Sequence, residues 1–199
     1  MNIFRIHIGI FAALIAVVLA GPLPAQDEDV FAFIPHGGKT LLTHVLQDAS
    51  VDTVKALLTG KRTRDEWLGY LHEHKAAVAA LAAFGDHEML TLADYLSFNM
   101  PLPEGSVSAD PGKADWNAEL PPDGRDLALE NCQFCHIITV VVTQDKTRDA
   151  WLGTMNKPSH VEIELSPPQR EALASYLVLN GAIPVDLVPE ELRAGGASY

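Results

Sequence analysis

The sequence predicts an all-α fold made of two tandem helical units. Two blocks of residues occur twice along the chain in the same order, which indicates that one structural unit has been duplicated. Helix-capping signals precede apolar stretches, and almost no segment alternates apolar and polar residues with the period of a β-strand. The repeated blocks are Thr-Arg-Asp-x-Trp-Leu-Gly at residues 63–69 and 147–153, and Tyr-Leu-x-x-Asn at residues 95–99 and 176–180.

The predicted helices carry specific start signals. Thr63 with Glu66, and Ser166 with Gln169, have the spacing of capping boxes, in which the two side chains bond each other's backbone N–H groups. The segment at residues 140–143, Val-Val-Val-Thr, is the main departure from helical character, and we expect it to be extended.

The composition changes along the chain and predicts its domain boundaries. An apolar run at residues 8–20 is followed by small residues up to Ala25, and it is too short for a comfortable membrane span, which is typical of a cleaved signal peptide. An uncleaved membrane anchor is the weaker alternative. A stretch rich in Pro, Gly, Ser and Asp separates the two helical units. The predicted segments are a signal peptide at 1–25, a first unit at 26–103, a linker at 104–120, a second unit at 121–186 and a tail at 187–199 with one helical turn.

Both cysteines of the chain lie in one motif, Cys132-Gln133-Phe134-Cys135-His136. C-x-x-C-H is the sequence at which c-type haem is attached covalently. Two thiols at this spacing can reach the two vinyl groups of one porphyrin, and the adjacent histidine can bind the iron as its proximal ligand. The motif therefore predicts one covalently bound haem c, held by Cys132, Cys135 and His136.

The first unit lacks this motif. When Gly38 is aligned with Gly124, the positions of the two cysteines and the histidine are taken by Leu46, Ala49 and Ser50. We therefore expect a haem-free copy of the second unit.

The sequence gives weaker support to two other interpretations of the cysteines. A thioredoxin-like dithiol needs a strand before the motif, but residues 127–131 have helical character. A zinc site needs further ligands at suitable spacing, and the chain has no second cysteine pair.

The second unit resembles the small monohaem cytochrome c domain of class I type. Gly124 stands eight residues before Cys132, and a tryptophan-bearing helix and a last helix with Tyr176 and Leu177 follow. The resemblance covers residues 121–184 and, without the motif, more loosely 35–103. It implies that a helix ending at the motif crosses the last helix. We therefore expect Leu127 to contact the Tyr176 helix, and Leu41 the Tyr95 helix.

The resemblance also implies a sixth iron ligand between the motif and the last helix, usually a methionine. Met155 is the only methionine after His136, and it lies unusually close behind Trp151. His160, in a loop that follows Pro158, is the alternative and would lower the reduction potential. An open sixth position is the third alternative. Lys146, Arg125 and Arg148 are candidate partners for the haem carboxylates.

The function implied is transfer of single electrons, with no enzymatic activity of its own. We expect a periplasmic carrier, or the cytochrome subunit of a dehydrogenase, that passes electrons to a respiratory-chain acceptor. The alternatives are a five-coordinate haem sensor or enzyme that binds a small ligand, and a structural or interaction subunit of a redox complex.

The charge of the chain constrains its partners. The formal net charge is −12, from 26 acidic and 14 basic residues. Such a chain is poorly suited to nucleic acid or to an anionic membrane surface, and it suits a redox partner with a basic docking face. No segment after the signal peptide is predicted to span a membrane.

Overall fold

The structure is a computed structural model that describes residues 29–105, 114–133, 135–160 and 162–193. The chain divides into two compact units, Met1–Val30 and Phe31–Tyr199, and all the elements below belong to the second. Every regular element in the described residues is a helix, which confirms the all-α prediction. The predicted signal peptide lies outside the described residues. None of the described helices has the length and hydropathy needed to cross a membrane.

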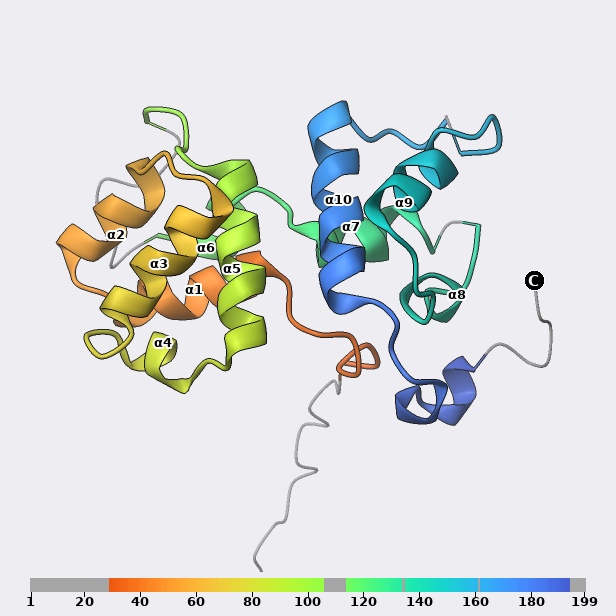
Figure 1. The fold of residues 1–199 in the computed structure, drawn as a ribbon, viewed down its shortest axis with the longest axis horizontal. Coiled ribbons are helices and arrows are strands. Elements are labelled where there is room, and N and C mark those ends of the chain that lie inside the picture. Colours follow the sequence, from red (N-terminus) through yellow and green to blue (C-terminus); the bar gives the residue numbers. More distant parts are fainter. Residues whose placement is uncertain (1–28, 106–113, 134, 161, 194–199) are drawn as a thin grey trace, which may run out of the picture. The chain divides into compact units, whose positions relative to one another are not determined.

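The first six helices enclose one hydrophobic core, which we call the N-terminal cluster (Figure 1). Its largest fully buried side chains include Trp67, Leu71 and Leu92. The helices are α1 (Gly38–Asp48), α2 (Val51–Thr59), α3 (Arg64–His74), α4 (Ala79–Ala83), α5 (Asp86–Asn99) and α6 (Trp116–Glu119).

The remaining helices enclose a second core, which we call the C-terminal cluster. It includes Trp151, Met155 and Leu173, all buried. The helices are α7 (Gly124–Asn131), α8 (Thr139–Val142), α9 (Arg148–Met155) and α10 (Pro167–Asn180), followed by the 3₁₀ turns η2 (Val185–Leu187) and η3 (Glu190–Leu192). The helical turn predicted in the tail is thus present at η3.

Both predicted capping boxes form. Thr63 N–H donates to Glu66 Oε2 over 2.8 Å, and the Glu66 N–H donates back to the Thr63 hydroxyl, so α3 starts where the sequence predicts. Ser166 and Gln169 make the same arrangement at the start of α10. These two pairs satisfy N–H groups that the first turn of a helix leaves without intrahelical acceptors.

The prediction of an extended segment at residues 140–143 is wrong. Residues 139–142 form α8, and the Thr143 N–H donates to the Thr139 carbonyl. The reason is burial, because Ile138, Val141 and Val142 are all buried in the C-terminal cluster. Their i, i+3, i+4 spacing is that of a helix face, and it outweighs the strand preference of β-branched residues.

The described part of the predicted linker is not a structureless connection. Trp116 in α6 and the following Leu120 are 5% and 3% exposed, and both belong to the N-terminal cluster. Burial of these two apolar side chains outweighs the turn-forming composition around them.

In each cluster the first helix crosses the 14-residue helix at a glycine. A Cβ placed on Gly124 would lie 2.1 Å from the Tyr176 Cβ, and a Cβ on Gly38 would lie 2.1 Å from the Tyr95 Cβ. As expected, α7 packs on α10 and α1 packs on α5. Leu127 and Leu41 are buried in the same clusters as these two tyrosines.

The segment that precedes each cluster packs on the other one. Ile34, ahead of α1, is buried in the C-terminal cluster, whereas Leu120, ahead of α7, is buried in the N-terminal cluster. The crossing tyrosines tie these segments down, because the Tyr176 hydroxyl donates to the Pro35 carbonyl over 2.6 Å. The Tyr95 hydroxyl donates to the Pro121 carbonyl over 2.8 Å. We call residues 31–35 and 116–121 the exchanged segments.

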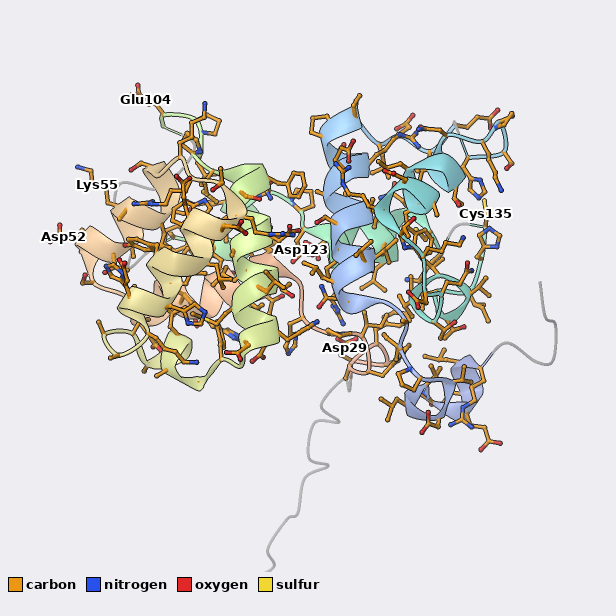
Figure 2. All side chains as sticks on the ribbon, in the orientation of Figure 1. Asp29, Asp52, Lys55, Glu104, Asp123 and Cys135 are labelled. Atoms are coloured by element: carbon orange, nitrogen blue, oxygen red, sulfur yellow. The ribbon has the colours of Figure 1, made fainter. Side chains whose placement is uncertain are left out.

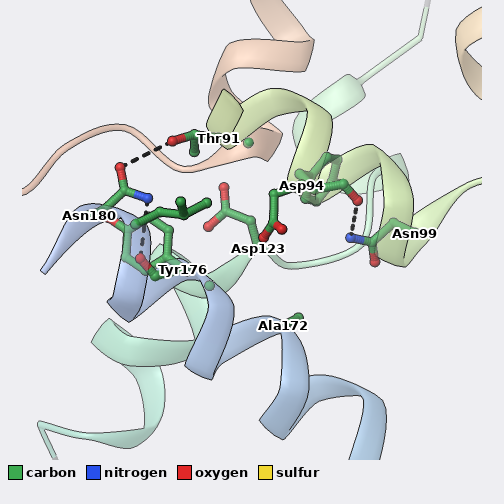
Figure 3. Close-up of a pocket in the computed structure, with 11 residues that line it drawn as sticks. Thr91, Asp94, Asn99, Asp123, Ala172, Tyr176 and Asn180 are labelled. Atoms are coloured by element: carbon green, nitrogen blue, oxygen red, sulfur yellow. Dashed lines mark hydrogen bonds between the residues drawn. The ribbon is translucent and has the colours of Figure 1, made fainter. Parts of the chain in front are cut away.

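Helices α5 and α10 pack against each other around a small polar cavity of about 20 Å³, roughly the size of one water molecule (Figure 3). The Thr91 hydroxyl donates to Asn180 Oδ1 over 3.2 Å. The Ser175 hydroxyl donates to Asp94 Oδ1 over 2.9 Å. These bonds satisfy side chains that are almost fully buried.

Asp123, beside this cavity, serves two helices at once. Its Oδ1 accepts the Arg125 and Asp126 N–H groups over 2.8 and 3.0 Å, at the start of α7. Its Oδ2 accepts the Lys39 N–H over 2.8 Å, at the start of α1. The carboxylate leaves no room for a side chain at Gly37, whose Cβ would lie 2.0 Å from Oδ2.

We expect Asp94 to make the stability of the fold depend on pH. Burial raises the pKa of its carboxyl above the ordinary value of 3.8, despite the Ser175 hydrogen bond. The folded protein then binds a proton more tightly than the unfolded chain does. The ionised carboxyl therefore destabilises the fold fully above its folded-state pKa, and this penalty disappears below 3.8.

The Asp94→Asn variant tests this, because the amide oxygen can still accept the Ser175 hydroxyl. Relative to the wild type, the variant should gain unfolding free energy near neutral pH and lose that advantage as the pH falls toward 3.8. Urea unfolding at several pH values measures the difference. A difference that does not change with pH would contradict the expected role of the carboxyl.

Candidate functional site

A cavity of about 360 Å³ opens into the C-terminal cluster. Its volume falls in the usual range for sites that bind a cofactor or other small molecule. All five site residues predicted from the sequence line this cavity. They are Cys132, Cys135, His136, Met155 and His160.

The two cysteines reach the cavity because α7 ends at the motif. Cys132 is the last hydrogen-bonded position of the helix, with its N–H donating to the Ala128 carbonyl. The chain then turns, and the His136 N–H donates to the Cys132 carbonyl over 3.3 Å. Figure 2 shows Cys135 in the connection between α7 and α8. Cys132, Cys135 and His136 all line this cavity.

The surroundings of the cysteines do not favour thiol chemistry. Burial raises the pKa of the Cys132 thiol to about 11, so it carries little of the reactive thiolate at neutral pH. The element before the motif is the helix α7 and not a strand. Both features argue against a thioredoxin-like dithiol, which needs a low thiol pKa and a preceding strand.

The walls of the cavity are largely apolar. Val141, Trp151, Leu173 and Leu177 line it, and all four are buried side chains of the C-terminal cluster. Val141 belongs to α8, Trp151 to α9, and Leu173 and Leu177 to α10. Such walls suit a large apolar ring system better than a polar substrate.

Two lysines line the cavity, and they are the positive groups available to an anionic ligand. Lys146 Nζ lies 4.5 Å from the centroid of the Trp151 ring, and Lys157 follows α9. Partial burial, with a smaller effect of Lys157, lowers the pKa of Lys146. The other predicted carboxylate partners point elsewhere. Arg125 donates to the Phe31 carbonyl, and Arg148 pairs with Glu171.

The two distal candidates occupy different settings. Met155 is the last residue of α9 and is 6% exposed, within the C-terminal cluster. His160 lies in the loop after α9, and its ring centroid is 6.1 Å from that of His136, with the two rings inclined by 31°.

The N-terminal cluster has buried apolar side chains in the segment that aligns with the motif and in the helix after it. Leu46, which aligns with Cys132, is 4% exposed. The nine-residue helix α2 follows α1 in the chain, as the four-residue α8 follows α7, and it adds the buried Val54, Leu57 and Leu58. The sequence difference at the motif therefore coincides with a difference in how the core is filled.

Sequence analysis missed Arg170, whose guanidinium bonds the backbone on both sides of His160. Its Nη1 donates to the Met155 carbonyl, its Nη2 to the Ile163 carbonyl and its Nε to the Leu165 carbonyl. A usable signal was present. A cation in the first turns of a helix is unfavourable to the helix dipole, so an arginine there indicates another requirement.

The chain matches no protein-family model, and neither the curated proteins nor the solved structures contain a match to it.

Proposed function

We propose that this protein is a c-type cytochrome that carries single electrons through one haem c. In this proposal Cys132 and Cys135 form the two thioether bonds, and His136 is the proximal iron ligand. The observation that carries it is one cavity lined by Cys132, Cys135 and His136 of the motif and by both distal candidates. When bound, the haem would supply reversible one-electron chemistry at its iron.

The residues around the cavity fit such a group. The apolar walls would cover the porphyrin faces and exclude water, which favours a stable redox centre. Cys132 and Cys135 both line the cavity and would supply the thiols for attachment through the vinyl groups. Lys146 and Lys157 would pair with the haem carboxylates, since carboxylates near an apolar site need cationic partners.

We further propose that the two clusters are copies of one cytochrome c-like unit, and that the first has lost its haem. The support is a set of matching contacts in addition to the sequence repeat. Arg62 stands over the Trp67 ring at 4.4 Å, as Lys146 stands over Trp151 at 4.5 Å. The crossing glycines are also matched, and so are the tyrosines that hold the exchanged segments.

The proposed setting is the periplasm, where the protein would link a donor to a respiratory-chain acceptor. Its acidic balance suits a partner with a basic face. The N-terminal cluster, with no haem of its own, offers surface for a lasting contact, as in the cytochrome subunit of a dehydrogenase.

The test is to express the full chain with a competent c-type maturation system. We expect haem staining at the protein's mass after denaturation, and a low-spin spectrum that changes reversibly on reduction. The Cys132→Ser/Cys135→Ser double variant should lose all covalent haem, whereas Ala49→Ser, at the position in the first unit that aligns with Cys135, should keep it.

Carbon monoxide separates the electron carrier from a haem sensor or enzyme. A six-coordinate carrier has no open iron position, so the reduced protein should not bind the gas. Rapid binding would favour the sensor or enzyme. A wild-type chain without covalent haem would contradict the whole proposal.

A further inference from the structure

We propose that His160 is the distal ligand of the iron, and that Arg170 is a positioning residue that holds the His160 loop at the cavity. This inference rests on the proposed function, because it requires haem at the Cys132–His136 motif. It deepens that proposal by choosing between two candidates and by assigning a part to a residue outside the motif.

The separation of the two imidazole rings fits a shared iron. A metal–nitrogen bond of about 2.0 Å on each side would place the centroids of two ligating imidazoles about 6.3 Å apart. The centroids of His136 and His160 are 6.1 Å apart. Both side chains also line the same cavity, so the spacing and the location of the two rings are compatible with one iron between them.

The other ring nitrogen of His160 has the kind of partner that ligating histidines need. Its Nδ1 lies 3.1 Å from the Ser159 hydroxyl. When Nδ1 carries the proton and donates it to that oxygen, Nε2 has a free lone pair and the ring orientation is fixed. Metal-ligating histidines usually have such a hydrogen bond on the nitrogen that does not bind the metal.

Met155, in contrast, already has a packing role. It lies one helical turn after Trp151, and both side chains are buried in the C-terminal cluster. The Met155 carbonyl is one of the acceptors of Arg170. The helix end is therefore fixed at its backbone while the side chain fills the apolar wall.

Arg170 fixes both sides of the loop that carries His160. Three of its nitrogens donate to three backbone carbonyls, over 2.6 Å to Met155, 2.9 Å to Ile163 and 3.2 Å to Leu165. A planar guanidinium can make three such bonds in one orientation, whereas the single ammonium of lysine cannot reproduce the fork. The loop before and after His160 is thus tied to the first turns of α10.

The ligand is tested with His160→Ala and Met155→Leu in the haem-loaded full chain. We expect His160→Ala to keep its covalent haem, to bind carbon monoxide when reduced, and to recover a low-spin spectrum when imidazole is added. Met155→Leu preserves the volume of the side chain and should bind no carbon monoxide. The reverse pattern, with an open iron only in Met155→Leu, would overturn the assignment of His160.

The positioning role is tested with Arg170→Lys. Loss of one charge-assisted hydrogen bond corresponds to about a tenfold shift in a local equilibrium, so we expect about a tenfold larger fraction of haem open to carbon monoxide. Added imidazole should restore the low-spin spectrum. Arg193→Lys is the matched control, because Arg193 also donates to two backbone carbonyls, those of Val188 and Asp186, but in the tail.

The outcomes distinguish the inference from the proposed function. Covalent haem in every variant, with carbon monoxide binding unchanged in His160→Ala, would overturn the inference and leave the cytochrome proposal standing. Equal carbon monoxide binding in Arg170→Lys and Arg193→Lys would overturn the part assigned to Arg170. Absence of covalent haem from the wild-type chain would overturn both proposals.

Discussion

Replacing Gly124 with alanine should cost about 3 kcal/mol of unfolding free energy, at the upper end of what overpacking in a core usually costs. The added Cβ would lie 2.1 Å from the Tyr176 Cβ and 2.6 Å from its Cγ. A Cβ cannot be moved away by a change of side-chain rotamer, so α7 and α10 would have to separate. Their separation would also disturb the hydrogen bond from Tyr176 to the Pro35 carbonyl.

Gly153→Ala is the matched control, because Gly153 lies inside α9 with no heavy atom within 4 Å of an added Cβ. Alanine favours a helix interior over glycine by about 0.5–1 kcal/mol, so this variant should be slightly more stable than the wild type. Urea unfolding followed by circular dichroism gives both values. Equal stabilities for the two variants would show that the helices do not cross as closely as described.

Asp123→Ala should destabilise the protein by about 1–4 kcal/mol, because each lost helix cap costs about 0.5–2 kcal/mol and this carboxylate caps two helices. The three N–H groups that it accepts, from Lys39, Arg125 and Asp126, would lose their partner next to a buried cavity. Urea unfolding gives the loss. Asp115→Ala removes a single cap from α6 at an exposed position, and its cost should stay below about 1 kcal/mol.

Asp123→Asn separates the two contributions of the carboxylate. The amide offers one acceptor oxygen in place of two, so we expect a loss between those of the wild type and Asp123→Ala. An Asn variant as unstable as the Ala variant would mean that the second oxygen and the negative charge supply the whole effect.

The helices were predictable where local chemistry sets them. The capping boxes at Thr63 and Ser166 satisfy backbone groups within one turn, so their effect does not depend on distant residues. The prediction for residues 140–143 was wrong because it rested on the strand preference of β-branched residues. The spacing of the buried residues in this region is that of a helix. The exchanged segments could not be predicted, since which core buries Ile34 and Leu120 depends on contacts between distant parts of the chain.

Some residues of the candidate site could be predicted from the sequence, and others could not. The motif and its spacing identify Cys132, Cys135 and His136 without any structure. The distance between the His136 and His160 rings depends on the path of the loop after α9. That path is set by tertiary contacts, so the distance could not be predicted from the sequence. Arg170 was missed because its partners are backbone carbonyls, and any residue can supply these.

The exchanged segments have a consequence for how the protein is made. The hydrogen bond between Pro35 and Tyr176 joins residues 141 positions apart. The segment ahead of α1 can therefore pack on α10 only after nearly the whole chain has been synthesised. Contacts between residues so far apart in the sequence slow folding. A cut between α5 and α6 would leave each fragment with the segment that completes the core of the other. We therefore expect the two clusters to unfold in one cooperative transition.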